Sequence, residues 1–328
     1  MTQNTAISAG VPAATENSVA AGPRRSRWRR GKLRRNTELA ILLAPGLILF
    51  VGFVIVPMVF AIYYSFYNWD GYGPLNDNVG WFNYHFAFHD PAFLEAIRHT
   101  LILTVASVAL QGPLAIGISL LLNRKFFGRT FLRLVIFAPY VLPPAITAIM
   151  WDLMLQPNGF ADTLMKAIGL GGLVHFWLAD PSLTLWTNFV VLTWQYLGFG
   201  IVLLLAGLQN IPNELKQAAA IDGASPWQIT RRITLPLLAP TIRIWGFITV
   251  IGSLQIFDIV YVLTAGGPDN SSNTIATYMF SEGVDSQAYG FAAAVAVILF
   301  VFCFVFALIY QRFVMRRDTQ GALTRAVG

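Results

Sequence analysis

The chain has 328 residues, of which 56% are hydrophobic and 12% charged, and its mean hydropathy is +0.60. Soluble domains carry about a quarter charged residues, so this composition excludes an ordinary soluble protein. The net charge of +6 is assigned to loops facing anionic lipid headgroups. Nucleic acid is excluded as a partner because no basic, aromatic-interleaved domain lies outside the apolar segments. A lone cysteine, Cys303, excludes an internal disulfide and a thiolate metal cluster.

Six apolar segments are long enough to cross a bilayer, which requires about 20 helical residues. They are residues 39–64, 98–122, 134–156, 184–208, 242–264 and 289–311. The sequence therefore predicts an all-α polytopic membrane protein with six transmembrane helices. These helices form one domain over 38–318, between a disordered basic cytoplasmic tail (1–37) and a second cytoplasmic tail (319–328).

Lysine and arginine are placed asymmetrically about these spans. They concentrate before the first span, after the second and fourth, and in the C-terminal tail, while Arg98 and Lys166 lie on the other side. The positive-inside rule then predicts that both termini are cytoplasmic.

Prolines interrupt two of the spans. Pro139, Pro143 and Pro144 lie in the third span, and the pair Gly112-Pro113 lies in the second. Such breaks are tolerated where neighbouring helices satisfy the freed carbonyls. They suit a protein that opens and closes, but they are also common in membrane helices generally, and the sequence leaves both interpretations open.

Catalytic motifs are absent from the sequence. It has no Walker A run, no His-Glu-x-x-His and no Cys-x-x-Cys, so we predict no catalytic residue, no metal site and no cofactor bound by this chain. His85 and His89 have the i, i+4 spacing of a shared metal site, with solvated loop histidines as the alternative. Energy for uphill transport would then come from an ion gradient or from another subunit.

The hydrophilic loop 209–240 begins with a predicted helix. Pro212 suits its first turn, and Glu214 follows where the helix dipole favours an anion. The helix passes through Ala218, Ala219 and Ala220 and is predicted to end at Gly223, which can adopt a positive φ.

A second helix is predicted to begin directly afterwards. Ser225 suits its N-cap, Pro226 its first helical position, and Gln228 completes a capping box. Pro236 and Pro240 are expected to end this element before the fifth span. Two short helices on a glycine bend form a compact knob (residues 212–235), which favours a docking element over an amphipathic loop lying at the membrane interface.

The loop resembles the EAA loop of permease subunits in binding-protein-dependent ABC importers. The family pattern Glu-Ala-Ala, Asp-Gly-Ala and Ile-x-Leu-Pro maps onto 217–219, 222–224 and 233–236. The resemblance implies a type I ABC importer permease fold in which this loop docks in a cleft of the ATPase. The implied ATPase-coupling residues are Glu214, Gln217, Ala218, Ala219, Asp222, Gly223 and Ala224. Gln217 stands where the family has a glutamate, so this position would lack a carboxylate contact to the ATPase.

Further segments resemble the carbohydrate-uptake members of that family, of the maltose/glycerol-phosphate/trehalose type. These segments are residues 120–124, 128–133, 139–144 with Trp151, 257–268 and 289–293, and similarity covers roughly residues 40–312. The resemblance implies a bacterial inner-membrane location, a second and different permease subunit, and two copies of a cytoplasmic ABC ATPase that uses ATP and Mg. It also implies an extracytoplasmic sugar-binding protein.

Polar and aromatic residues inside the spans are candidates for a sugar pathway, because buried polar groups in membranes face cavities or partner helices. Amides, carboxylates and aromatic faces suit a polyhydroxylated ring. The candidates are Trp151, Asp152, Asn188, Trp194, Gln195, Gln255, Asp258 and Tyr261. Gln255, Asp258 and Tyr261 are expected on one face of the fifth span. The alternative is that the amides hold helices together and the aromatic residues lie at the membrane interface.

Three other functions are left open by the residues alone. An ion-coupled secondary transporter would use Asp258 or Asp152 as its ion site. A membrane scaffold would use the loop to bind a cytosolic partner. An ABC permease for peptides or amino acids is disfavoured by the carbohydrate-type segments.

Overall fold

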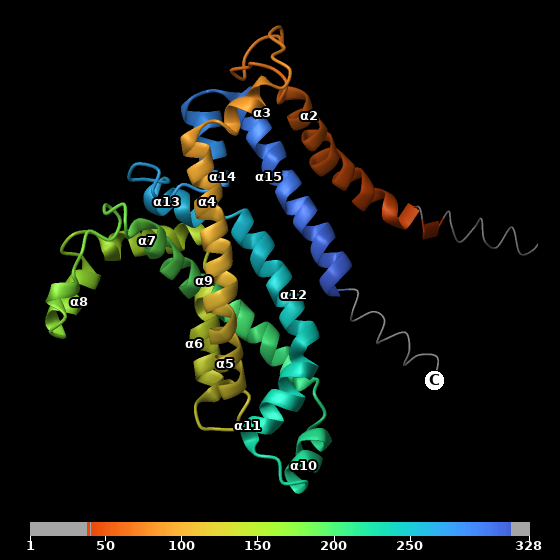
Figure 1. Cartoon of the computed structure of the whole chain (residues 1–328), viewed down its shortest axis with the longest axis vertical. Coiled ribbons are helices and arrows are strands. Elements are labelled where there is room, and N and C mark those ends of the chain that lie inside the picture. The colour runs from red at the N-terminus through yellow and green to blue at the C-terminus, as the bar shows by residue number, and fades with distance from the viewer. Residues whose placement is uncertain (1–37, 40, 316–328) are drawn as a thin grey trace, which may run out of the picture. The chain divides into compact units, whose positions relative to one another are not determined.

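A computed structural model of the chain describes residues 38–39 and 41–315 (Figure 1). The predicted tails 1–37 and 319–328, and with them both termini, lie outside the described residues. Within the described part, regular structure is helical apart from one isolated β-bridge between Tyr67 and Asn78. The predicted all-α fold is confirmed.

The chain divides into two compact units, residues 1–58 and 59–328. The described part of the first unit is apolar helix, including a π-helical turn at Val51–Ile55 that has no buried residue. The helix continues as α2 (Val56–Tyr64), and Ile41–Tyr64 is long and apolar enough to cross a membrane. Apolar side chains exposed all round a helix require lipid or another chain as surroundings.

Four continuous helices in the second unit are also long and apolar enough to span a membrane. The first, Pro91–Leu122, consists of α4 (Pro91–Ala106), a π-helical turn (Ser107–Gln111) and α5 (Gly112–Leu122). The others are α9 (Thr184–Gln209), Pro226–Leu254, and Tyr289–Met315, which contains α15 (Tyr289–Tyr310).

The third predicted span is a bent pair of helices. α6 (Arg129–Val141) and α7 (Pro144–Leu155) meet at 100°, and counting the pair as one span gives six. Leu142 and Pro143 both have extended backbone at the bend. Each precedes a proline, and the proline ring disfavours helical backbone in the residue before it.

The fifth span differs from its predicted limits. Its helix starts in the loop, at α11 (Pro226–Ile229), and continues through a π-helical turn (Thr230–Thr234) into α12 (Leu235–Leu254). The expectation that Pro236 and Pro240 end this element is therefore wrong. Pro236 lies in the first turn of α12, and the wide turn before it accommodates the missing N–H. Pro240 lies inside the helix, as prolines can in membrane helices packed in a bundle.

Residues 258–264, which the sequence placed in the fifth span, form a separate helix, α13 (Asp258–Thr264). The break leaves the carbonyl of Ile256 free to accept a hydrogen bond from Oγ1 of Thr274 at 3.0 Å. Thr274 is also the N-cap of the next helix. The remaining short helices are α3 (Phe82–Ala87), α8 (Phe160–Ala167) and α14 (Ile275–Phe280).

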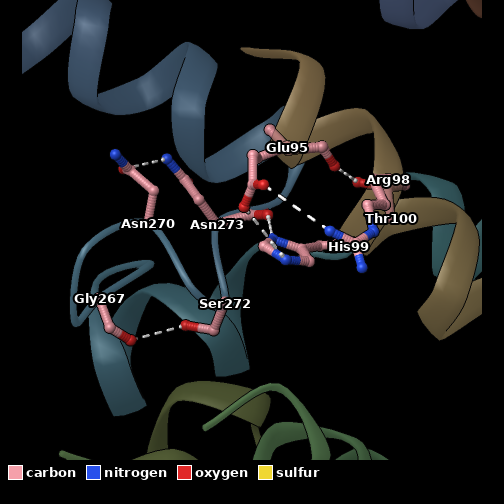
Figure 2. Close-up of polar contacts among 9 residues, drawn as sticks. Glu95, Arg98, His99, Thr100, Gly267, Asn270, Ser272 and Asn273 are labelled. Carbon is pink, nitrogen blue, oxygen red and sulfur yellow. Dashed lines mark hydrogen bonds and ion pairs between the residues drawn. The ribbon is translucent and has the colours of Figure 1, made fainter. Parts of the chain in front are cut away.

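A polar clamp joins the segment after α13 to α4 (Figure 2). Nδ1 of His99 donates to the carbonyl of Asn273 at 3.2 Å, and the backbone N of Ile275 donates to Oγ1 of Thr100 at 3.0 Å. Oε2 of Glu95 lies 3.8 Å from Nε2 of His99. His99 is a buried residue of α4, and its hydrogen bond fixes the connection between the fifth and sixth spans.

Candidate functional site

A cavity of about 190 Å³ lies among the second, third, fourth and fifth spans. Hydroxyl groups, an amide and aromatic rings share its wall with aliphatic side chains. The lining residues are Leu103, Ser107, Gln111, Tyr140, Leu192, Tyr196, Phe199, Trp245, Ile248, Thr249, Gly252, Ser253 and Ile256. Apolar surface with a few convergent polar groups is the composition of small-molecule sites.

The π-helical turn in the second span supplies the amide of this wall. Ser107 and Gln111 are its first and last residues and both are buried. Nε2 of Gln111 donates to Oγ1 of Thr193 at 3.0 Å and lies 3.4 Å from Oγ of Ser107. Single wide turns of this kind are frequent at functional sites in helices. Here the turn places two polar groups on the cavity and ties the second span to α9.

Aromatic rings from two spans form another part of the wall. Tyr140 of α6 stacks on Phe199 of α9, with ring centroids 5.0 Å apart and planes 24° apart. Tyr140 also meets the ring of Tyr196 edge-on at 6.3 Å. The cavity therefore has flat apolar faces with phenolic hydroxyls at their edges, which suits ligands that have both C–H faces and hydroxyl groups.

Trp245 fits into the bundle because two glycines leave space for its indole. A Cβ at Gly200 of α9 would lie 2.6 Å from Nε1 of Trp245, and one at Gly112 of α5 would lie 3.0 Å from Cη2. Trp245 is buried and lines the cavity. The close approach of α12 to α5 and α9 at this level thus depends on the two glycines.

None of the eight predicted pathway residues lines this cavity. Gln195 is buried, accepts from Oγ1 of Thr147 at 2.5 Å and donates to the carbonyl of Leu142 at 2.9 Å. It thereby fastens α9 to the bend of the third span. Asn188 is also buried and donates to Oγ1 of Thr264 on α13 at 3.3 Å. These contacts favour helix packing for the two amides, and substrate contact stays a prediction for them.

The other pathway residues are spread over separate elements. Trp151 of α7 packs edge-on against Trp194 of α9 at 5.7 Å, and Asp152 accepts from Gln156 at 3.3 Å. Tyr261 of α13 stacks on Phe257 at 5.1 Å.

The expectation of a shared face for Gln255, Asp258 and Tyr261 on the fifth span is wrong. α12 ends at Leu254 and α13 begins at Asp258, so no continuous helix carries the three residues.

The sequence did contain a signal for part of the cavity. Gln111 is a polar residue inside a span, directly before Gly112-Pro113. Asn188 and Gln195 were chosen as candidates because they are polar residues inside spans, and Gln111 meets the same criterion. Tyr196 and Trp245 carried no comparable signal, because aromatic residues in spans are usual at interfaces and in packed cores.

The loop after the fourth span forms the predicted pair of short helices. α10 (Asn213–Ile221) ends in a Schellman motif, in which Gly223 has a φ of 83°. The backbone N of Ala224 donates to the carbonyl of Ala219 at 2.9 Å, and that of Gly223 to Ala220 at 3.1 Å.

The capping box of α11 is present as expected. The backbone N of Ser225 donates to Oε1 of Gln228 at 2.7 Å, and the N of Gln228 donates to Oγ of Ser225 at 3.4 Å. Figure 1 shows α10 and α11 together at one end of α12.

The surface of the knob combines charge with exposed apolar side chains. Among the predicted coupling residues Ala219 and Ala224 are half-buried, while Glu214, Gln217, Ala218, Asp222 and Gly223 are exposed. Two large apolar side chains add to them: Ile221 is 86% exposed and Trp227 is 66% exposed. A shallow groove of about 320 Å³ lies along the glycine bend, α11 and the π-helical turn that follows, and has Asp222 and Arg232 in its wall. Exposed apolar anchors beside charges are characteristic of protein-binding surfaces.

The amino-acid sequence matches a known protein family and several of its members. Residues 111–319 match the family described as binding-protein-dependent transport system inner membrane component. A probable ABC transporter permease protein of Pyrococcus horikoshii is 34% identical over 283 residues, covering 85% of this chain and 97% of that protein. A multiple sugar-binding transport system permease protein of Streptococcus mutans is 36% identical over 255 residues, covering 78% and 87%.

The fold also matches a solved structure. A chain in the crystal structure of a bacterial alginate ABC transporter, in complex with an alginate pentasaccharide-bound periplasmic protein, superposes with a TM-score of 0.76 at 25% identity. The match covers 87% of this chain and 96% of that one. The chain belongs to the family of inner membrane components of binding-protein-dependent transport systems, and the ABC permease fold expected from the loop motifs is confirmed.

Proposed function

We propose that this chain is a permease subunit of an ATP-driven ABC importer and forms half of the translocation pathway for a mono-, di- or oligosaccharide. The observation that carries the proposal is the cavity of about 190 Å³, where the amide of Gln111 and the hydroxyls of Ser107, Thr249 and Ser253 accompany stacked aromatic rings. Sugars need hydrogen-bond partners and flat apolar surfaces together. Relatives described as sugar permeases support the same substrate class.

The knob is the proposed point of energy coupling. The family transports with binding proteins, and the exposed α10 and α11 offer both charges and apolar anchors for a separate cytoplasmic ATPase. Two copies of that ATPase would use ATP and Mg, a second permease would complete the pathway, and an extracytoplasmic sugar-binding protein would deliver substrate. The knob would then lie in the cytoplasm, and the positive-inside pattern supports a cytoplasmic location for both termini, in a bacterial inner membrane.

Coupling is tested by changing the knob in the assembled importer. Asp222→Lys reverses a charge in the groove, and Gly223→Val strains a left-handed backbone position. Both variants are expected to insert into the membrane but to lose sugar-stimulated ATPase activity. Gly169→Val is the matched control, because Gly169 has the same φ of 83° and open space around it, outside the knob. Normal stimulation in both knob variants would refute the assignment.

The substrate path is tested with a pair of glutamines. Gln111→Met removes an amide from the cavity wall, whereas Gln195→Met removes one that binds Thr147 and Leu142 outside it. The first is expected to raise the sugar concentration needed for half-maximal uptake, and the second to reduce stability. A similar rise in that concentration for the second would instead support Gln195 as a pathway residue. Uptake that collapses with an ionophore and continues without ATP would replace the proposal with a secondary transporter.

A further inference from the structure

The extracytoplasmic helix α8 has a surface that the transport function leaves unexplained. Its chain emerges from the third span, since α7 ends at Leu155 and α8 begins at Phe160. In Figure 1 α8 lies beyond the end of α7, at the edge of the view. Four residues separate the two helices, so α8 stays near the end of the third span.

One side of α8 is fixed to the protein. Asp162 is 3% exposed, and its carboxylate accepts from the backbone N of Asn158 at 2.9 Å and from the indole of Trp177 at 3.1 Å. Ala161 and Trp177 pack against the buried cluster around Ile259. These contacts set the rotation of α8 about its own axis.

The opposite side divides into an apolar and a polar strip. Phe160, Leu164 and Ile168 follow at i, i+4 and i+8, so they lie on one face, and they are 61%, 48% and 61% exposed. Thr163 and Lys166 occupy the neighbouring strip and are also exposed. Nζ of Lys166 donates to Oδ1 of Asn158 at 3.1 Å.

The following loop adds further exposed apolar side chains. Leu170, Leu173 and Phe176 are about half exposed or more. The only carboxylate on α8, Asp162, faces inward, so the outward surface carries the positive charge of Lys166 without a negative one. This combination of bulky apolar residues, a lysine on the polar side and no exposed acid complements an anionic lipid surface.

We infer that α8 lies in the outer leaflet of the membrane as an interfacial helix, with Phe160, Leu164 and Ile168 among lipid chains and Lys166 at the phosphates. Two observations favour lipid over a protein partner: the chain has just left a span, and the exposed apolar, basic and buried strips are arranged as in helices that lie in the membrane plane. The consequence is that the bend of the third span is anchored from outside the bundle by lipid.

The test uses single nitroxide labels on the full-length chain with its co-purified subunits, in vesicles of phosphatidylethanolamine and phosphatidylglycerol. The native thiol is removed by Cys303→Ala, and single labels are placed by Leu164→Cys on the apolar strip and Thr163→Cys on the adjacent polar strip. Phe160→Cys provides a second apolar position. Collisions with oxygen, which concentrates in lipid, and with a water-soluble nickel chelate are measured for each label.

The inference predicts that labels at 160 and 164 gain oxygen collisions and lose nickel collisions relative to the label at 163. Nickel collisions at 160 and 164 that are as frequent as those of a water-exposed label at 163 would show that the strip faces water and would overturn it. Exclusion of both reagents at 160 and 164 would show a protein contact, with the second permease or the binding protein, and would overturn it as well.

Discussion

The seating of Trp245 between two glycines allows a quantitative test of how the cavity is built. In Gly200→Ala the new methyl would lie 2.6 Å from Nε1 and 3.1 Å from Cδ1 of the indole. Both distances are shorter than ordinary contacts, so Trp245 or α9 must move. Overpacking of this kind typically costs about 1–3 kcal/mol.

Alanine also favours helices over glycine by about 1 kcal/mol, and this gain must be separated from the clash. Gly117→Ala is the matched control, because Gly117 lies in the neighbouring helix α5 and a Cβ there meets nothing within 4 Å. Both variants receive the same propensity gain, so their difference isolates the overpacking. We expect Gly200→Ala to be less stable than Gly117→Ala by about 1–3 kcal/mol.

Reversible unfolding by sodium dodecyl sulfate in mixed micelles measures this difference in the free energy of unfolding. Adding Trp245→Phe removes Nε1 and should cancel most of the penalty, which a double-mutant cycle reports as a coupling of similar size. Equal stability of Gly200→Ala and Gly117→Ala, or a penalty that persists without the indole, would refute this account of the wall.

Three further predictions concern groups outside the cavity. Burial, and to a smaller extent the nearby Asp90 carboxylate, raise the pKa of Glu282. The folded state therefore binds the Glu282 proton more tightly than the unfolded state does. The free energy of unfolding is expected to fall as the pH rises from the ordinary glutamate pKa through the raised one. Glu282→Gln should flatten the dependence of the unfolding midpoint on pH, and an unchanged slope would contradict the assignment. Thr147→Val leaves the buried Oε1 of Gln195 without its donor and should cost about 1–3 kcal/mol in the same unfolding assay, while Thr147→Ser should not. Arg133→Gln removes a guanidinium bond of 2.8 Å to the last carbonyl of α5 and should lower stability by about 1.5 kcal/mol, with Arg129→Gln as the comparison.

Local chemistry was the most predictable part of the molecule. Gly223 ends α10 because its φ is positive, and Ser225 with Gln228 starts α11 because the two form reciprocal hydrogen bonds. Each motif involves residues within six positions of one another along the chain, so it can be predicted from the local sequence without knowing which helices pack together. The apolar spans followed as directly, because each needs only length and apolarity, and they number six when the bent pair of the third span is counted as one.

Features that depend on neighbouring helices were not predictable in the same way. The prolines of the third span indicated a break, but its angle of 100° arises where Gln195 of α9 binds the carbonyl of Leu142. Pro236 indicated a helix end, yet the wide turn before it keeps the helix continuous.

The cavity wall was missed for a related reason. Gln111, Tyr140, Tyr196 and Trp245 come from four different spans, and helical periodicity gives the face of each residue without saying which faces meet.

One continuous helix, Pro226–Leu254, carries residues of both the knob and the cavity wall. Trp227 at the knob and Trp245 at the cavity are 18 residues apart, or about 27 Å of helix. No flexible linker lies between them to absorb a displacement. This helix is expected to bend most easily at the wide turn Thr230–Thr234 and at Pro240, where backbone hydrogen bonds are altered or missing. The stiffness of these few turns therefore determines how much of a movement at the knob arrives at the cavity wall and how much is lost as bending.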